Sequence, residues 1–508
     1  MRENTSCTFK VVTVPQTPNP LHRHTPDWLI LTIACIAQFM VVLDVSIVNV
    51  ALPHMGLDLG LNQTKAQWVI NAYVLTFAGF LLLGGRCADL FGRRRVYLVG
   101  VLIFTLASVA AGVSHSATEM IVARAVQGLG GAILSPATLT IIVTTFHGAR
   151  MPKAIGAWSA VAGAGGAVGG LAGGLLTGLV SWRWIFFINV PFGIIATVAA
   201  VMYLQELRNQ DASSKLDITG AFLITGGLTA LIYGVVNTTT QGWGATSIHE
   251  WFALAAVGII GFVFWEAKVA SQPLVAFRIF HSRPLTVANL VMLLAGGAFF
   301  SMWFFLTYYF QVILGYGAVR AGFSFLPMAV AIIIGSQVSA HLLGKTGVRP
   351  LLLIGSLLAT VGFYWLSLIT VHSSYWANLL PPSFVASFAM GLLFAPLATA
   401  ATAKVDRRDA GLASGVLNSS RQIGGSLSLA ILGTVAADRT ASALHGLMTP
   451  SMAATHVAYV EGYVRAFQCA GVVTLVAFFV SLALPAGVGH HSSHGPAVSP
   501  ETVSGAGH

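Results

Sequence analysis

Residues 28–53 read WLILTIACIAQFMVVLDVSIVNVALP, an apolar run of 26 residues that holds a single acid, Asp44. An α-helix needs about 20 predominantly apolar residues to cross the hydrocarbon core of a bilayer. A transmembrane β-barrel would show short segments of alternating polarity instead. The run therefore predicts a membrane-spanning helix that carries a carboxylate.

The composition of the 508-residue chain points the same way. Hydrophobic residues make up 56% and charged residues 8%, whereas soluble domains are about 25% charged. This excludes a soluble globular fold, and it excludes disorder because disordered chains are poor in apolar residues. Two of the four cysteines, Cys35 and Cys469, lie in long apolar runs, which argues against a disulfide scaffold. We therefore expect an all-α integral membrane protein.

Fourteen apolar runs, separated by charges, proline or glycine clusters, predict spanning helices. The run that starts at Trp28 is too long for a signal peptide, and no small-residue cleavage site follows it. The segment 437–463 reads as an unusually long polar connection. The predicted spans are 28–51, 66–85, 96–114, 118–145, 153–178, 184–204, 217–238, 250–268, 285–312, 321–343, 350–370, 376–401, 410–436 and 464–485.

Lysine and arginine are distributed unevenly between the loops. With the N-terminus in the cytoplasm, 19 of the 26 fall on the cytoplasmic side and five outside, while Arg124 and Arg421 fall within spans. Cytoplasmic loops of membrane proteins carry such an excess. The distribution predicts 14 spans with both termini cytoplasmic. Together with contact to anionic lipid, it accounts for the net charge of +10 without nucleic acid.

Two short segments recur in the second half of the chain. Residues 92–100 (GRRRVYLVG) are echoed by 347–355 (GVRPLLLIG), and 131–136 (GAILSP) by 391–396 (GLLFAP). Composition alone could produce such echoes, but a repeated architecture would place a substrate site between two bundles near the midplane. The predicted division is an N-terminal tail 1–27, a six-helix bundle 28–204, a linker with two extra helices 205–283, a second bundle 284–485 and a C-terminal tail 486–508.

Two charged residues lie inside predicted spans at similar depth. Asp44 lies about seven residues, or ~10 Å, below the outer end of its span, and Arg124 lies a comparable distance below the outer end of span 4. A buried charge is costly and marks a functional site by default. We predict that Asp44 and Arg124 pair, directly or through water, as a proton-coupling site. The alternative is an ion pair that only locks helices together.

The loop between spans 2 and 3 contains Asp89, Gly92 and Arg93. Gly92 allows the tight turn that a short helix–helix link needs, and Asp89 can accept hydrogen bonds from backbone N–H groups or from the flanking arginines. These residues predict a cytoplasmic gate. The alternative is a basic loop that only sets topology.

Span 5 carries glycines at intervals of four, which allow close approach of a neighbouring backbone. We predict that Gly165, Gly169 and Gly173 form a pliable contact between moving halves; static packing is the alternative. A second series, Gly166, Gly170 and Gly174, runs beside them.

The second half has no acid at the depth of Arg421, which must therefore face a wet cavity, carbonyl groups or an anionic group. Polar and aromatic residues suit the lining of a site for amphiphilic drugs, although the aromatic ones could equally form an interfacial belt. The predicted substrate-binding residues are Gln38, Trp303, Tyr308, Gln311, Asn418 and Arg421.

The sequence carries no motif for several other functions. There is no P-loop, so ATP drive is unsupported, and no soluble enzyme site is visible. His490, His491 and His494 could bind a metal ion, but a disordered tail is the preferred interpretation. We expect no metal, no cofactor and no enzymatic activity.

Two further motifs complete a family pattern: residues 182–191 read WRWIFFINVP, and residues 411–422 read GLASGVLNSSRQ. With the acid-bearing run 43–53, the loop 85–94 and the motif from Arg124 to Gly128, they resemble the major facilitator superfamily. The closest resemblance is to its 14-helix drug:proton antiporters, over roughly residues 28–485. One departure is Gly170, which stands where that family usually carries a proline in span 5.

This resemblance implies two six-helix bundles with spans 7 and 8 as an extra pair, in a plasma-membrane pump for drugs or antibiotics. It implies that Arg124 helps proton exchange, that Asp89 helps close the cytoplasmic side, and that the proton gradient alone supplies the drive. The alternatives are a proton-coupled uptake permease of the same fold and a non-transporting membrane sensor. The sensor would usually carry a sizeable soluble output domain, which the predicted loops and tails are too short to hold.

Overall fold

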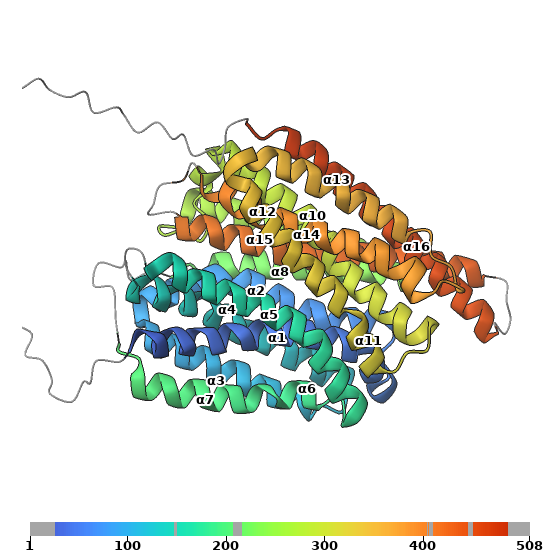
Figure 1. Cartoon of the computed structure of the whole chain (residues 1–508), viewed down its shortest axis with the longest axis horizontal. Helices are drawn as coiled ribbons and strands as arrows, with labels where there is room; N and C mark the ends of the chain where they lie inside the picture. The colour runs from blue at the N-terminus through green and yellow to red at the C-terminus, as the bar shows by residue number, and fades with distance from the viewer. Residues whose placement is uncertain are drawn as a thin grey trace, which may run out of the picture.

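A computed structural model describes residues 26–146, 150–206, 216–403, 405, 410–445 and 451–485. Every regular element in these ranges is a helix (Figure 1), which confirms the all-α prediction. Residues 1–25 and the tail 486–508, with its three histidines, lie outside the described residues.

The long helices follow the predicted spans. Short π-helical turns continue α9 (Trp265–Val269) and α10 (Tyr309–Ile313) and open α14 (Tyr375–Leu379), and a 3-10 turn (Phe277–His281) precedes α10. The α-helices are α1 (Asp27–Leu59), α2 (Gln63–Phe91), α3 (Arg93–Gly112), α4 (Ala117–Thr145), α5 (Arg150–Leu179), α6 (Trp184–Phe187), α7 (Asn189–Tyr203), α8 (Ile218–Gln241), α9 (Thr246–Phe264), α10 (Arg283–Tyr308), α11 (Ala318–Ser324), α12 (Leu326–Thr346), α13 (Val348–Leu366), α14 (Leu380–Thr402), α15 (Ala410–Leu444) and α16 (Met452–Leu482).

Each of the 14 predicted spans falls on one of these helices or on two consecutive ones. Within the described residues, 12 helices are long and apolar enough to cross a membrane. The other two are α5 and α15, of 30 and 35 residues; α15 carries the polar run around Arg421. The count of 14 spans therefore stays a prediction.

The connection predicted over 437–463 is wrong. Helix α15 continues to Leu444 and α16 already begins at Met452. The two extensions pack on each other: Thr440 donates to the carbonyl of Ala458 at 3.2 Å, and Arg439 pairs with Glu461 at 2.8 Å. Polarity indicated a loop, but a helix that leaves the bilayer keeps its backbone bonds and exposes polar side chains instead.

The two halves are built on the same plan. In the first, α2 packs on α4, α1 on α5, α3 on α4 and α3 on α7; in the second, α12 packs on α14, α10 on α15, α13 on α14 and α13 on α16. Figure 1 shows α1–α7 on one side and α10 with α12–α16 on the other, while the short helix α11 reaches across to α5. The repeat predicted from two short echoes is present in the packing of whole helices.

The echoed residues occupy equivalent places. Gly92 and Gly347 have φ angles of 97° and 75°, and a helix starts directly after each. Such positive φ angles favour glycine because it has no Cβ. Gly100 lies against Leu134 in the first half, as Gly355 lies against Leu393 in the second.

The hairpin of α8 and α9 belongs to neither set. Helix α8 packs on α2 of the first half and on α15 of the second, with Leu75, Ile232 and Ala430 in one apolar cluster. It therefore lies over the seam where α2 and α15 meet. The domain boundaries at 204–205 and 283–284 stay a prediction.

That seam runs along both helices in antiparallel register. Asn71 accepts a hydrogen bond from Ser426 at 3.1 Å. Gln67 lies against Gly433 toward one end, and Leu82 against Gly415 toward the other. The first turn of α1 and the last turn of α16 lie at the same end of the molecule in Figure 1, as an even number of crossings requires.

The predicted topology can be tested by external cysteine labelling. A cysteine placed at Ser247, in the first turn of α9, should react with a membrane-impermeant reagent added outside, whereas one placed at Ser213 should not. Both variants belong in a background without the native cysteines. External labelling at position 213 would break the 14-span arrangement.

Candidate functional site

The charged pair predicted from depth is present. On α1 the Asp44 carboxylate accepts from the Arg124 guanidinium on α4, with a distance of 2.5 Å between Oδ2 and Nη1. The relative exposure of Asp44 is 0% and that of Arg124 is 1%. Opposite charges this deep compensate each other where no water can do so. The predicted pairing is confirmed.

The second carboxylate oxygen is held by two amides. Asp44 Oδ1 accepts from Gln127 Nε2 at 2.7 Å and from Asn189 Nδ2 at 3.2 Å. Gln127 lies one turn after Arg124 on α4, so both face α1, while Asn189 opens α7. The carboxylate is thus held by three donors from two helices.

Ser108 on α3 completes the network. Its hydroxyl accepts from Gln127 at 3.1 Å and from Asn189 at 2.9 Å, and donates to the carbonyl of Phe186 at 3.0 Å. The two amides are therefore oriented by a shared acceptor. Four helices, α1, α3, α4 and α7, meet at this one acid.

Arg124 has partners besides Asp44. Its Nε donates to the carbonyl of Val69 at 3.2 Å and its Nη1 to Gln127 Oε1 at 2.6 Å. The guanidinium lies 4.3 Å from the centroid of the Tyr73 ring, a favourable cation–π arrangement. None of these further partners carries a negative charge, so among the described partners Asp44 alone compensates the charge of Arg124.

The sequence did not single out Ser108, Tyr73 or Asn189 as site residues. Asn189 stood within the quoted 182–191 motif, and Gln127 within the motif after Arg124, so a signal existed for both. Ser108 and Tyr73 lie in ordinary apolar runs and carry no such signal.

The two glycine series of α5 face different halves. Gly165, Gly169 and Gly173 lie against α1 of their own half: a Cβ on Gly173 would be 2.7 Å from the carbonyl oxygen of Ile47. This corrects the predicted placement of these glycines between the halves. The spacing of four residues showed that these glycines share one face of α5, but it did not show which neighbouring helix that face contacts.

The contact between the halves is made by the neighbouring stripe. A Cβ on Gly174 would lie 2.5 Å from the carbonyl oxygen of Ala318, and one on Gly322 would lie 2.6 Å from that of Gly170. Gln311 adds a hydrogen bond across the same boundary, from its Nε2 to the carbonyl of Val50 on α1 at 2.7 Å. The halves are therefore closed together where α5 and the C-terminal half of α1 meet α11 and the π-helical end of α10.

The predicted substrate-binding residues do not form one cluster among the described contacts. Gln38 accepts from Ser135 at 3.1 Å inside the first half. At the closed end of the second half, the Trp303 ring stacks on that of Phe325 with centroids 4.8 Å apart, and Tyr308 packs on Phe304. Gln311 ties the halves together.

The remaining two candidates lie together on α15. Arg421 donates to Asn418 Oδ1 at 3.0 Å, and its Nε is buried without a partner in the part of the chain that the structure describes. No acid pairs with Arg421 there, as the sequence predicted. An Arg with unused donors can bind a carboxylate or carbonyl group.

The predicted gate is described in part. Gly92 lies close to Glu206, which pairs with Arg95 at 3.6 Å, and Arg94 donates to the carbonyl of Val201 at 2.7 Å. These bonds tie the start of α3 to the end of α7. Arg93 begins α3. The side chain of Asp89 lies outside the described residues.

Comparison with known proteins identifies the family of this chain. Residues 34–429 match the family model described as the Major Facilitator Superfamily. It is 40% identical over 466 residues to a cephamycin export protein of Amycolatopsis lactamdurans, covering 91% of this chain and 95% of that protein. It is 39% identical over 457 residues to a puromycin resistance protein of Streptomyces alboniger, covering 89% and 90%.

The fold has counterparts among solved structures. An inward-facing bacterial homolog of the human lysosomal transporter Spinster matches with a TM-score of 0.64 and 16% identity, covering 90% of this chain and 97% of that one. The chain belongs to the major facilitator superfamily. It groups there with the drug efflux transporters and is a multi-pass membrane protein.

The closed contact can be tested with Gly174→Ala and the matched control Gly166→Ala. A Cβ at Gly174 meets backbone of α11, whereas one at Gly166 meets nothing within 4 Å. Overpacking costs about 1–3 kcal/mol, so Gly174→Ala should lower the ratio of closed to open molecules by about 5- to 150-fold. Distances between spin labels at Val180 and Gly317 would report this. Equal distances in the two variants would show that this contact does not hold the halves together.

Proposed function

We propose that the chain is a proton-coupled antiporter that exports drugs or antibiotics across the plasma membrane by alternating access, with both termini in the cytoplasm. The observation that carries this proposal is the Asp44 carboxylate, buried and held by Arg124, Gln127 and Asn189. Relatives named for cephamycin export and puromycin resistance support the direction and the substrate class.

The coupling step is the protonation of Asp44. While Asp44 is ionised, its charge compensates that of Arg124 and draws α4 toward α1. A proton removes this attraction and leaves Arg124 with neutral partners, the carbonyl of Val69, Gln127 and the Tyr73 ring. An uncompensated buried cation is unfavourable, so protonation favours an arrangement in which Arg124 finds water or another anion. Proton binding thereby biases the packing of four helices.

A cationic drug near Asp44 would stabilise the ionised carboxylate as Arg124 does. Drug and proton then compete for one site, which is what antiport requires. Moving one charge through a 100 mV potential supplies about 2.3 kcal/mol, so a modest difference in proton affinity between the two states is enough for coupling.

The substrate site lies between the halves. In this proposal Gln38 lines it from the first half, and Asn418 and Arg421 from the second, with Arg421 offering donors to a carbonyl or anionic group. Trp303 and Tyr308 supply aromatic surface. Gln311 holds one end of this site closed through its hydrogen bond to the carbonyl of Val50. That bond breaks when this end opens.

Asp89, Gly92 and Arg93 form the opposing gate in this proposal. Asp89 docks at the N-terminal end of α15 when the transporter faces outward, because that end carries the positive pole of the helix dipole. No cofactor takes part, the chain has no enzymatic activity of its own, and its partners are the drug, protons and lipid.

The direction of transport separates an exporter from an uptake permease. Expression in a pump-deficient bacterial host should raise the minimum inhibitory concentration for at least one antibiotic in a broad panel and lower its cellular accumulation. A permease of the same fold would raise accumulation, and a sensor would leave it unchanged.

The coupling role of Asp44 can be tested in everted vesicles. Asp44→Asn should abolish drug-induced proton release, because the amide cannot exchange a proton, and Asp44→Glu should keep part of it. The matched control is Asp58→Asn on the same helix. Asp58 accepts a hydrogen bond from the Trp182 indole at 2.9 Å, and the carbonyl oxygen of Asn can accept the same bond. Drug-induced proton release should therefore stay normal in Asp58→Asn. Uphill export with a normal proton signal in Asp44→Asn would remove Asp44 from the mechanism.

A further inference from the structure

A second pair of acids lies at the end of the α8–α9 hairpin that is predicted to be cytoplasmic. Asp217 caps the N-terminus of α8, and Glu266 lies in the π-helical turn that continues α9. Their relative exposures are 8% and 5%. Neither residue belongs to the Asp44 network, and the transport mechanism proposed above does not use them.

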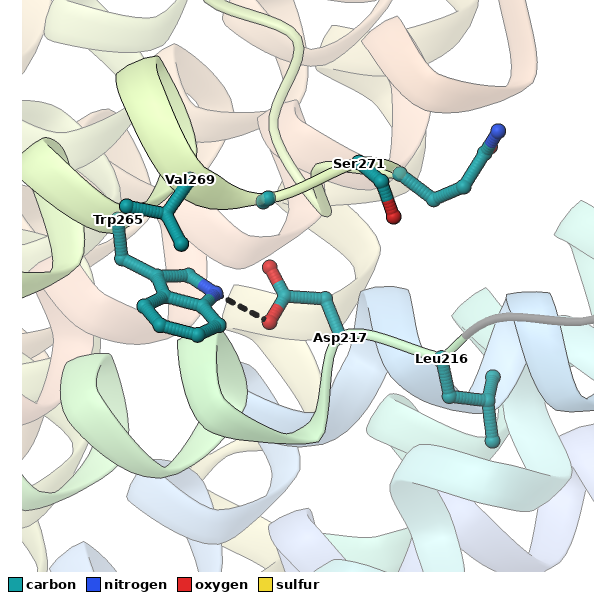
Figure 2. Close-up of a pocket in the computed structure, with 7 residues that line it drawn as sticks. Leu216, Asp217, Trp265, Val269 and Ser271 are labelled. Carbon is teal, nitrogen blue, oxygen red and sulfur yellow. Dashed lines mark hydrogen bonds between the residues drawn. The ribbon is translucent and has the colours of Figure 1, made fainter.

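One oxygen of each acid has an ordinary role. Asp217 Oδ1 accepts from the Trp265 indole at 2.7 Å and from the backbone N–H of Gly220 at 2.8 Å (Figure 2). Glu266 Oε2 accepts from the backbone N–H of Val275 at 3.1 Å. These bonds orient both carboxyl groups firmly.

The other two oxygens, Asp217 Oδ2 and Glu266 Oε1, are buried and have no hydrogen-bond partner among the described residues. Figure 2 shows the free Asp217 oxygen turned away from the indole, toward the side where Val269 and Ser271 lie. A buried acceptor without a donor is unfavourable. Within the described part of the chain, each of these two oxygens could therefore still accept a hydrogen bond.

The two free oxygens converge on one place. Each lies 2.7 Å from the position that a Cβ on Gly220 would occupy, so they are at most twice that distance apart. Gly220 lies in the first turn of α8, and its lack of a side chain makes the room. Two ionised carboxylates cannot share such a buried site without strong repulsion.

Among the described residues, no ion pair joins a cation to either acid. Asp217 is the charged group that acts on Glu266, whose other bonding partners are backbone N–H groups of the 274–275 segment. Lys268, in the same π-helical turn, is exposed and forms no ion pair with either acid in the described part of the chain. A cavity of about 240 Å³, lined by Asp217, Trp265, Ser271 and Gln272 among others, gives water a way to reach Asp217.

We propose that Asp217 and Glu266 together hold one exchangeable proton between Oδ2 and Oε1, as a protonation site separate from Asp44. The protonated carboxyl donates to the ionised one, so both free oxygens are satisfied and the pair carries a single negative charge. Loss of the proton leaves two like charges facing each other across Gly220, which pushes the end of α9 away from the start of α8.

Infrared difference spectroscopy of the full chain in lipid nanodiscs tests this. A pH titration of the wild-type protein should show a carboxylic acid C=O band that disappears as the pH rises. Asp217→Asn and Glu266→Gln should each remove this band, because the amide ends the sharing. Asp44→Asn should retain it, so the result does not depend on whether Asp44 couples transport to protons.

Two glycine variants keep both acids and check the geometry. Gly220→Ala should weaken the band because its Cβ occupies the space between the carboxyl groups. Gly226→Ala, in the same helix with nothing within 4 Å of an added Cβ, should leave the band unchanged. The proposal is overturned if the band persists in both acid variants, if Gly220→Ala matches Gly226→Ala, or if the signal follows the sodium or potassium concentration rather than pH.

Discussion

An ionised carboxylate inside a membrane must find its donors within the protein, and Asp44 finds them in three side chains. Arg124 and Gln127 come from α4 and Asn189 from α7, while Ser108 on α3 aligns the two amides. Through this single acid, helix α1 is connected directly to α4 and α7, and through the two amides to α3. The charge of that acid therefore bears on the packing of several helices at once.

The two halves share their packing but not their chemistry. The glycine turns, the helix pairs and the prolines inside α4 and α14 recur. The charges do not, since among the described residues Arg421 bonds to Asn418, whereas Arg124 pairs with an acid that two amides also hold. Backbone contacts thus repeat in both halves, while the buried polar residues differ: the first half holds an ion pair bound by amides, and the second holds an arginine with unused donors.

Much of this could be predicted from the sequence. The Asp44–Arg124 pair followed from depth, because helical rise converts residue number into height. The role of Ser108 could not be predicted, because it lies on an apolar helix. The residue pattern of such a helix does not show which of its faces points toward Asp44. The same ambiguity hid which glycine stripe of α5 faces α11. The extensions of α15 and α16 were not predicted. A change from apolar to polar residues indicates where a helix leaves the membrane, but the helix itself can continue beyond that point.

The hairpin of α8 and α9 is attached at the seam of α2 and α15. When two rigid bodies rock against each other, displacement grows with distance from the axis and is smallest along it. A seam that keeps contact along its length, from Gln67 to Leu82, lies close to such an axis. Two helices packed on that seam would therefore travel little in such a motion, whichever way the halves turn.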